Sequence, residues 1–197
     1  MQIFPIEIYT AKYYKDMNFV YSTLQPYLDE YNTIFNNNQG SMRGSGVCSY
    51  VERRDLHLDP AFSDVVDFLK EQCIAYWSLL KYNPKYKPII KEMWFNVYNN
   101  ESFIDIHNHA PMTTTCSLYV QKLPNVGNIV FENPLSTLLK HQPYYIDKDN
   151  YHTLFETEVE AQTGDLVMFP GWLNHKTLPN TSDKERIMIG ANICTGV

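Results

Sequence analysis

The sequence lacks the segments that mark membrane and nucleic-acid proteins. No stretch of about 18 consecutive apolar residues occurs, so we expect no membrane-spanning helix. Basic residues do not cluster, and the net charge of −6 argues against nucleic acid as a partner. The segment Met1–Glu7 has neither a basic stretch nor a long apolar core, and no signal peptide is expected there.

The sequence also lacks a cysteine framework. The four cysteines contain no C-x-x-C pair and are far apart in the chain, at Cys48, Cys73, Cys116 and Cys194. Buried free thiols are the usual state of such scattered cysteines. We therefore expect a reducing, cytoplasmic location rather than a disulfide-bonded fold.

The chain is rich in hydrophobic and aromatic residues. Of 197 residues, 44% are hydrophobic and 14% aromatic, including 15 Tyr and 10 Phe. This length predicts a single domain over residues 1–197, and the aromatic content favours β-strands. A homodimer stays open.

The pattern of elements changes near residue 90. Before it, apolar residues at helical spacing predict helices over Asn18–Phe35 and from Asp59-Pro60 to Asn83, after a short strand Ile3–Tyr9. After it, short strands alternate with turn residues: 93–98, 103–109, 114–122, 129–131, 154–159, 166–169 and 186–194. We expect a mostly β fold with supporting helices, a jelly roll in which residues 1–90 form the helical or mixed support and 91–197 the β core.

Three histidines have the spacing of a metal site. His107 and His109 lie two residues apart in a predicted strand, so their side chains share one face. His175 follows the apolar strand 166–169 and a Pro-Gly turn. Three facial ligands with open positions are what non-heme iron oxygenases and zinc hydrolases need. The alternative is that these histidines are ordinary packed or surface residues.

Asp105 is a competing ligand. In an unbroken strand it shares the face of His107 and His109, and a carboxylate can complete a two-histidine site. Pro111 suggests that the strand ends soon after His109, and we favour His109 as the third ligand. The other histidines, His57, His141 and His152, fall in loops or variable stretches, and we expect no metal there.

Arg186 opens the last predicted strand, beside Ile187, Met188 and Ile189. An arginine buried in such a run is costly without an anion, and its planar fork suits a carboxylate. We expect it to hold a dicarboxylate near the metal. The alternative is a surface arginine paired with Asp183 or Glu185.

Taken together, these motifs resemble the 2-oxoglutarate/Fe(II)-dependent dioxygenase superfamily, in a branch with a His-x-His pattern. The resemblance covers roughly residues 92–195. It is carried by His107-Asn108-His109-Ala110-Pro111, Cys116-Ser117-Leu118-Tyr119-Val120, Gly164-Asp165-Leu166-Val167-Met168-Phe169-Pro170-Gly171-Trp172-Leu173-Asn174-His175 and the final strand from Arg186. Most of the superfamily has aspartate or glutamate at the position of His109.

The resemblance implies a double-stranded β-helix, the cupin-like jelly roll, that binds Fe(II). It implies that 2-oxoglutarate is clamped by Arg186 beside Tyr119, and that Asn96 and Tyr98 contact this co-substrate; the alternative for Asn96-Val97-Tyr98 is an ordinary strand. The implied reaction uses O₂ to hydroxylate a substrate while 2-oxoglutarate becomes succinate and CO₂. An apolar lining is expected from Trp94, Phe95, Leu118, Phe131 and Trp172.

The substrate itself is not readable from the chain. A small molecule or a protein side chain fits the expected chemistry, and residues 135–153 and the loop Asn36–Gly46 are candidate substrate walls. Two other functions compete: a three-histidine, cupin-type metalloenzyme that does not use 2-oxoglutarate, and a non-catalytic jelly-roll binding protein.

Overall fold

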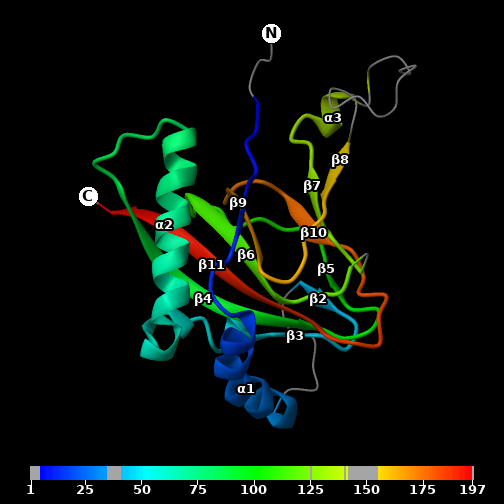
Figure 1. The fold of residues 1–197 in the computed structure, drawn as a ribbon. Helices are drawn as coiled ribbons and strands as arrows, with labels where there is room; N and C mark the ends of the chain where they lie inside the picture. Colours follow the sequence, from blue (N-terminus) through cyan, green and yellow to red (C-terminus); the bar gives the residue numbers. More distant parts are fainter. Residues whose placement is uncertain (1–4, 35–40, 125, 140, 142–154, 197) are drawn as a thin grey trace.

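The computed structural model describes residues 5–34, 41–124, 126–139, 141 and 155–196. Its centre is a six-stranded antiparallel sheet (Figure 1). In spatial order the strands are β1 (Tyr9–Lys12), β9 (Asp165–Pro170), β6 (Thr114–Gln121), β11 (Arg186–Gly196), β4 (Lys87–Tyr98) and β3 (Val47–Cys48). The long strand β11 pairs along both of its edges, with β4 and β6.

Two smaller sheets complete the β part. One has the order β10 (His175–Thr177), β7 (Ile129–Glu132) and β8 (Glu156–Val159), and the other pairs β2 (Met42–Arg43) with β5 (Phe103–Ile104). A buried cluster that includes Phe131, Phe169 and Leu173 lies between the large sheet and the three-stranded sheet. This arrangement confirms the predicted jelly roll.

The two long helices, α1 (Met17–Ile34) and α2 (Ser63–Leu79), cover the other face of the six-stranded sheet (Figure 1). Short helical turns occur at Ser49–Val51, Leu56–Leu58 and Pro60–Phe62, with α3 at Ser136–Leu139. The Asp59 side chain accepts a hydrogen bond from the Ala61 amide at 2.9 Å and caps the turn that leads into α2, as the Asp-Pro signal predicts. None of the described helices is long and apolar enough to span a bilayer.

Alternation along the central strands separates two environments. On β11, Ile187, Ile189 and Ile193 belong to the core under the helices. Their neighbours point the other way, toward the three-stranded sheet: Arg186, Met188, Gly190 and Asn192. This inner face, continued by β4 and β6, forms the floor of the candidate site.

Several strands differ from the prediction: β4 starts at Lys87 rather than at 93, and β10 was not predicted. The first strand starts at Tyr9 rather than ending there; residues 5–8 are not in a strand, and 1–4 lie outside the described residues. The expected strand 103–109 is interrupted at 105–106: β5 ends at Ile104, the Asp105 amide makes one more hydrogen bond to the Ser41 carbonyl at 2.9 Å, and the next bridge joins His107 to His175. The strands β1 and β3, both from the first 90 residues, form the edges of the large sheet. The single-domain assignment stays a prediction.

Candidate metal centre

The structure brings His107, His109 and His175 together. One ring nitrogen from each lies within 4.8 Å of the others, a spacing that one metal ion can bridge. The main chains of His107 and His175 exchange two hydrogen bonds of 2.9 Å, and the His109 amide donates to the Gly171 carbonyl at 2.7 Å. Backbone pairing between segments far apart in sequence therefore sets the side-chain geometry.

Hydrogen bonds to carbonyls orient two of the imidazoles. Nδ1 of His107 lies 2.7 Å from the Asp105 carbonyl oxygen, and Nδ1 of His175 lies 3.0 Å from that of Leu173. A carbonyl oxygen only accepts, so each Nδ1 carries the proton and each Nε2 keeps its lone pair. This is the arrangement in which a histidine is ready to bind a metal ion.

The three imidazoles are held neutral. Burial lowers the pKa of His109 to about 3, with a further contribution from His107. Burial also lowers the pKa of His107, and it brings the pKa of His175 well below its usual value, aided by the other two rings. A cluster of neutral nitrogens can accept a cation without first losing protons.

This burial makes the stability of the metal-free protein depend on pH. An unfolded imidazole has a pKa of 6.5, while the folded ones stay neutral at lower pH, so protonation favours the unfolded chain. Stability is complete above 6.5 and falls below it by about 1.4 kcal/mol per pH unit for each histidine that stays neutral. Urea midpoints measured from about pH 7 to 5 should fall, and less steeply for His109→Gln. Equal slopes in both proteins would contradict this assignment.

Asp105 takes no part in the cluster. Its carboxylate pairs with Nε of Arg43 at 2.8 Å, and both side chains are about half exposed. The break after Ile104 removes the strand periodicity that would have aligned Asp105 with His107. Between the two ligand sets left open by the sequence, the geometry favours the one with His109.

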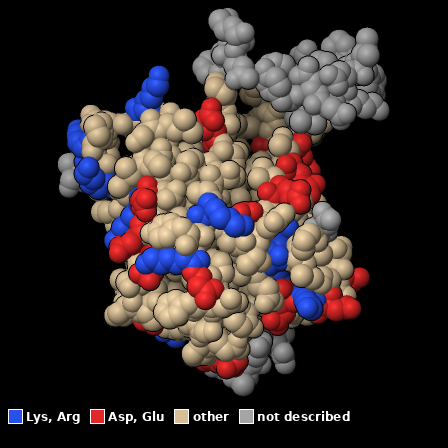
Figure 2. Space-filling model, viewed as in Figure 1, with Lys and Arg blue, Asp and Glu red and all other residues tan. Residues whose placement is uncertain are grey.

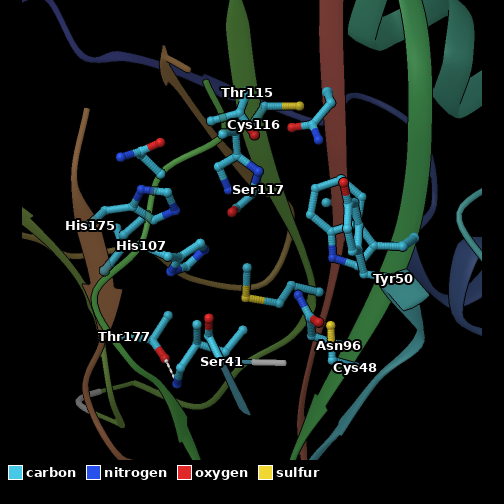
Figure 3. A pocket seen from close by; sticks show the side chains of 18 of the residues that line it. Ser41, Cys48, Tyr50, Asn96, His107, Thr115, Cys116, Ser117, His175 and Thr177 are labelled. Carbon is cyan, nitrogen blue, oxygen red and sulfur yellow. Dashed lines mark hydrogen bonds between the residues drawn. The ribbon is translucent and has the colours of Figure 1, made fainter. Parts of the chain in front are cut away.

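A cavity of about 520 Å³ opens beside the histidines. Figure 3 shows His107 and His175 on one side and Tyr50, Cys48 and Asn96 on the other. Among the described residues, its lining contains no Asp, Glu, Lys or Arg. Ser41 and Met42, from the predicted substrate-wall loop, belong to this lining. Residues 43–46, 135–139 and 141 are described and do not line the cavity, and the remainder of the two predicted walls, 36–40, 140 and 142–153, lies outside the described residues.

The apolar wall only partly follows the prediction. Trp94 lines the cavity, its ring 5.7 Å from that of His109 at 29°, and it lies over Gly190, where a Cβ atom would be 2.5 Å from the indole. The centre of the Phe131 ring lies 6.1 Å from the centre of the His175 ring. Phe95 and Leu118 instead belong to the core under the helices, because odd and even positions of a strand face opposite sides. Trp172 is 52% exposed.

Arg186 is buried next to the cavity but does not line it. Only 1% of the residue is exposed, and its guanidinium lies over Tyr98, 4.0 Å from the ring centre. It donates hydrogen bonds to the carbonyls of Gly127, at 2.5 Å, and Leu178, at 3.1 Å. No carboxylate lies within pairing distance among the described residues, so the alternative of a surface pair with Asp183 or Glu185 does not hold.

Several buried donors around Arg186 lack partners. Nε of Arg186 and the hydroxyls of Tyr98 and Tyr119 make no hydrogen bond with the described residues. Burial raises the pKa of Tyr119 to about 12, although the charge of Arg186 opposes the shift. Unpaired buried donors are rare in folded proteins and indicate a missing acceptor. Asn96 and Tyr98, the other predicted co-substrate residues, line the cavity.

Lys122 belongs to the same buried region and was missed from sequence. It is 4% exposed and its Nζ has no hydrogen-bond partner among the described residues. Burial lowers its pKa, and the charge of Arg186 lowers it further. A lysine that ends a strand before Leu123-Pro124 looks like an ordinary surface residue, so no sequence signal marks it. Two neighbouring buried cations strengthen the case for an anion here.

Three solved structures illustrate the similarity of the fold. A prolyl-4-hydroxylase from Pseudomonas putida is 15% identical, with 97% of this chain and 94% of that chain covered and a TM-score of 0.61. HygX from Streptomyces hygroscopicus, with nickel and 2-oxoglutarate bound, is 10% identical, with 96% and 83% covered and a TM-score of 0.58. The epimerase SnoN, in complex with Fe³⁺, α-ketoglutarate and nogalamycin RO, is 13% identical, with 96% and 79% covered and a TM-score of 0.61. At these identities the likeness shows the fold.

Sequence comparison identifies the family. No curated protein matches the chain. Residues 92–192, slightly more than half of it, match the family model described as "Putative 2OG-Fe(II) oxygenase". This region contains the three histidines, Arg186 and the strands that carry them. The chain therefore belongs to the 2OG-Fe(II) oxygenase family, whose enzymes use iron, 2-oxoglutarate and O₂.

Proposed function

We propose that His107, His109 and His175 hold Fe(II), and that Arg186 and Tyr119 hold the far carboxylate of 2-oxoglutarate, with Asn96 and Tyr98 beside it. The observation that carries the metal assignment is the convergence of three neutral ring nitrogens within 4.8 Å, two of them oriented by carbonyls. The unpaired donors of Arg186 and Tyr119 support the carboxylate assignment.

The proposed reaction is hydroxylation of a C–H bond. With iron bound, O₂ oxidises 2-oxoglutarate to succinate and CO₂, and its second oxygen atom enters the substrate as a hydroxyl group. The protein holds the three histidines and the co-substrate in register, and the cavity wall of Trp94 and Met188 keeps water away from the reacting centre.

The neutral third ligand has a consequence for charge. Three imidazoles leave the full +2 charge on Fe(II), whereas a carboxylate at position 109 would reduce it by one. A bound 2-oxoglutarate dianion then faces the +2 charge of the proposed metal and the +1 charge of Arg186. This excess of positive charge favours tight binding of a dianionic keto acid in a cavity whose described lining carries no charged side chain.

We further propose that the substrate is a small molecule or a protein side chain and that the enzyme works in the cytoplasm. HygX and SnoN were solved with small molecules, and the four cysteines are free thiols, as a reducing compartment allows. Nucleic acid is not expected, because the net charge is −6; on the face shown in Figure 2, basic and acidic side chains are interspersed. A homodimer stays open.

Thermal unfolding with Mn(II) tests this proposal. We expect Mn(II) alone to raise the melting temperature, and 2-oxoglutarate or N-oxalylglycine to raise it further only when Mn(II) is present, because ligands that bind the folded state stabilise it. A metal shift without a keto-acid shift would instead favour the three-histidine, cupin-type enzyme. No shift with either would favour the non-catalytic jelly roll.

A further inference from the structure

One end of the cavity offers hydrogen-bond acceptors and no charged group. We call it the acceptor wall, formed by Tyr50, Thr115 and Asn192, all of which line the cavity (Figure 3 labels Tyr50 and Thr115). On the large sheet Asn192 pairs with Thr115 of β6 on one side and Glu92 of β4 on the other. It lies six residues along β11 from Arg186, so the wall is distinct from the proposed carboxylate clamp.

Glu92 determines which atoms the acceptor wall presents. Its carboxylate accepts hydrogen bonds from Nδ2 of Asn192 at 2.7 Å and from the Tyr50 hydroxyl at 3.0 Å. Because a carboxylate only accepts, the Asn192 amide cannot be reversed, and its Oδ1 must face elsewhere. The Tyr50 hydroxyl uses its single hydrogen in the bond to Glu92, so only its lone pairs remain for a ligand.

Thr115 completes the pattern. Its hydroxyl donates to the Ala191 carbonyl at 3.1 Å, so its oxygen is also left as an acceptor. Asn192 is 1% exposed, and its Oδ1 has no partner among the described residues. A buried acceptor without a donor is costly, and a ligand that supplies the donor removes the cost.

The acceptor wall is close to the histidines. The Trp94 ring lies 5.0 Å from that of Tyr50 and 5.7 Å from that of His109. A group bound at the wall therefore lies one aromatic ring away from the proposed iron ligands. Behind the wall, the Glu92 carboxylate pairs with Arg54, whose Nη1 is 3.6 Å away and whose guanidinium lies 5.4 Å from the centre of the Tyr50 ring, so this ion pair adds no net charge to the wall.

We propose that the acceptor wall binds an N–H group of the substrate: a primary amide, an ammonium or a guanidinium. The inference rests on the proposed function in one respect, namely that the molecule in this cavity is the substrate. Either an N–H or an O–H group can pair with one acceptor, but three acceptors line this wall, and an amide, ammonium or guanidinium nitrogen offers two or more hydrogens where a hydroxyl offers one. A substrate without any hydrogen-bond donor would leave Asn192 Oδ1 unpaired.

Ligand-observed NMR on the metal-free protein tests this. The probes are butyramide, n-butylammonium and n-butylguanidinium, with N,N-dimethylbutyramide as the analogue that has no N–H donor. We expect at least one donor probe to bind about tenfold more tightly than the analogue, the effect of a hydrogen bond to a buried acceptor. A decrease of binding with added salt identifies a cationic group.

Substitutions in the acceptor wall test whether the preference for N–H donors arises there. Asn192→Leu should remove the preference for N–H donors while the dimethyl analogue binds as before, and Tyr50→Phe should weaken it with less risk to folding. Asn18→Leu, on the exposed side of α1, is the control and should match the wild type. Equal binding of all four probes, or an unchanged preference in both wall variants, would overturn the inference.

These outcomes are separable from those of the proposed function. The NMR experiment uses neither metal nor 2-oxoglutarate, so a missing preference rejects the acceptor wall alone. Missing Mn(II) and keto-acid shifts reject the oxygenase site alone.

Discussion

Replacing His175 with alanine is expected to abolish metal binding and turnover. His175 is 5% exposed, its Nδ1 is fixed by the Leu173 carbonyl, and its ring packs 4.6 Å from that of Phe169. Loss of a residue that only supports a ligand typically costs up to about a hundredfold in metal affinity, so loss of a ligand should cost more. Calorimetry with Mn(II), and succinate formation with Fe(II) and 2-oxoglutarate, measure the two effects.

The control for His175→Ala is His141→Ala, an exposed histidine outside the cluster, which should retain metal and activity. Circular dichroism establishes that both variants are folded. Wild-type metal affinity in folded His175→Ala would mean that the three imidazoles are a packed cluster rather than a metal site.

The second large effect is expected from Arg186→Gln. Removing the guanidinium takes away a charge and a two-pronged donor from the proposed carboxylate site, and we expect 2-oxoglutarate affinity to fall about a hundredfold. Metal affinity should not change, because Arg186 is not among the clustered ligands. The affinity of the Mn(II)-loaded protein for 2-oxoglutarate is the measurement, and Arg186→Lys should recover part of it through the retained charge.

Two further variants distinguish a loss of the carboxylate site from a folding defect in Arg186→Gln. Arg186 also donates to the carbonyls of Gly127 and Leu178, so its loss can disturb the loop above it. Tyr119→Phe removes only a hydroxyl that has no hydrogen-bond partner in the described part of the chain, and it should weaken 2-oxoglutarate binding about five- to tenfold. Lys122→Met tests whether the second buried cation also contributes to 2-oxoglutarate affinity. Unchanged 2-oxoglutarate affinity in Arg186→Gln and Tyr119→Phe would place the co-substrate elsewhere.

Some of the site was visible in the sequence because it depends on short-range periodicity and residue chemistry. His107 and His109 are two residues apart, and Arg186 stands in an apolar strand where an unpaired charge is costly. The same periodicity misplaced Asp105, because the expected strand is interrupted after Ile104 and the carboxylate turns to Arg43. Backbone pairing, not local pattern, decides where a strand stops.

Other features required the packing of distant segments. Trp94 and Phe95 are equally apolar, and a strand buried on both faces gives no sign of which side faces the helices and which the cavity. Lys122 and the unpaired oxygen of Asn192 look unremarkable in sequence and become informative only through burial. The carbonyls that Arg186 contacts come from loops more than 50 residues upstream and 8 residues upstream.

By itself, the sequence determined the jelly-roll class, the three histidines and the arginine, because alternation, turn residues and the cost of burying charge act locally along the chain. The sequence favoured His109 over Asp105 as the third ligand, but only the tertiary structure showed that the Asp105 carboxylate pairs with Arg43 and which face of β4 and β11 lines the cavity. The tertiary structure also decided that Glu92 orients Tyr50 and Asn192. These outcomes depend on pairing and hydrogen bonds between residues far apart in the chain, which no local pattern encodes.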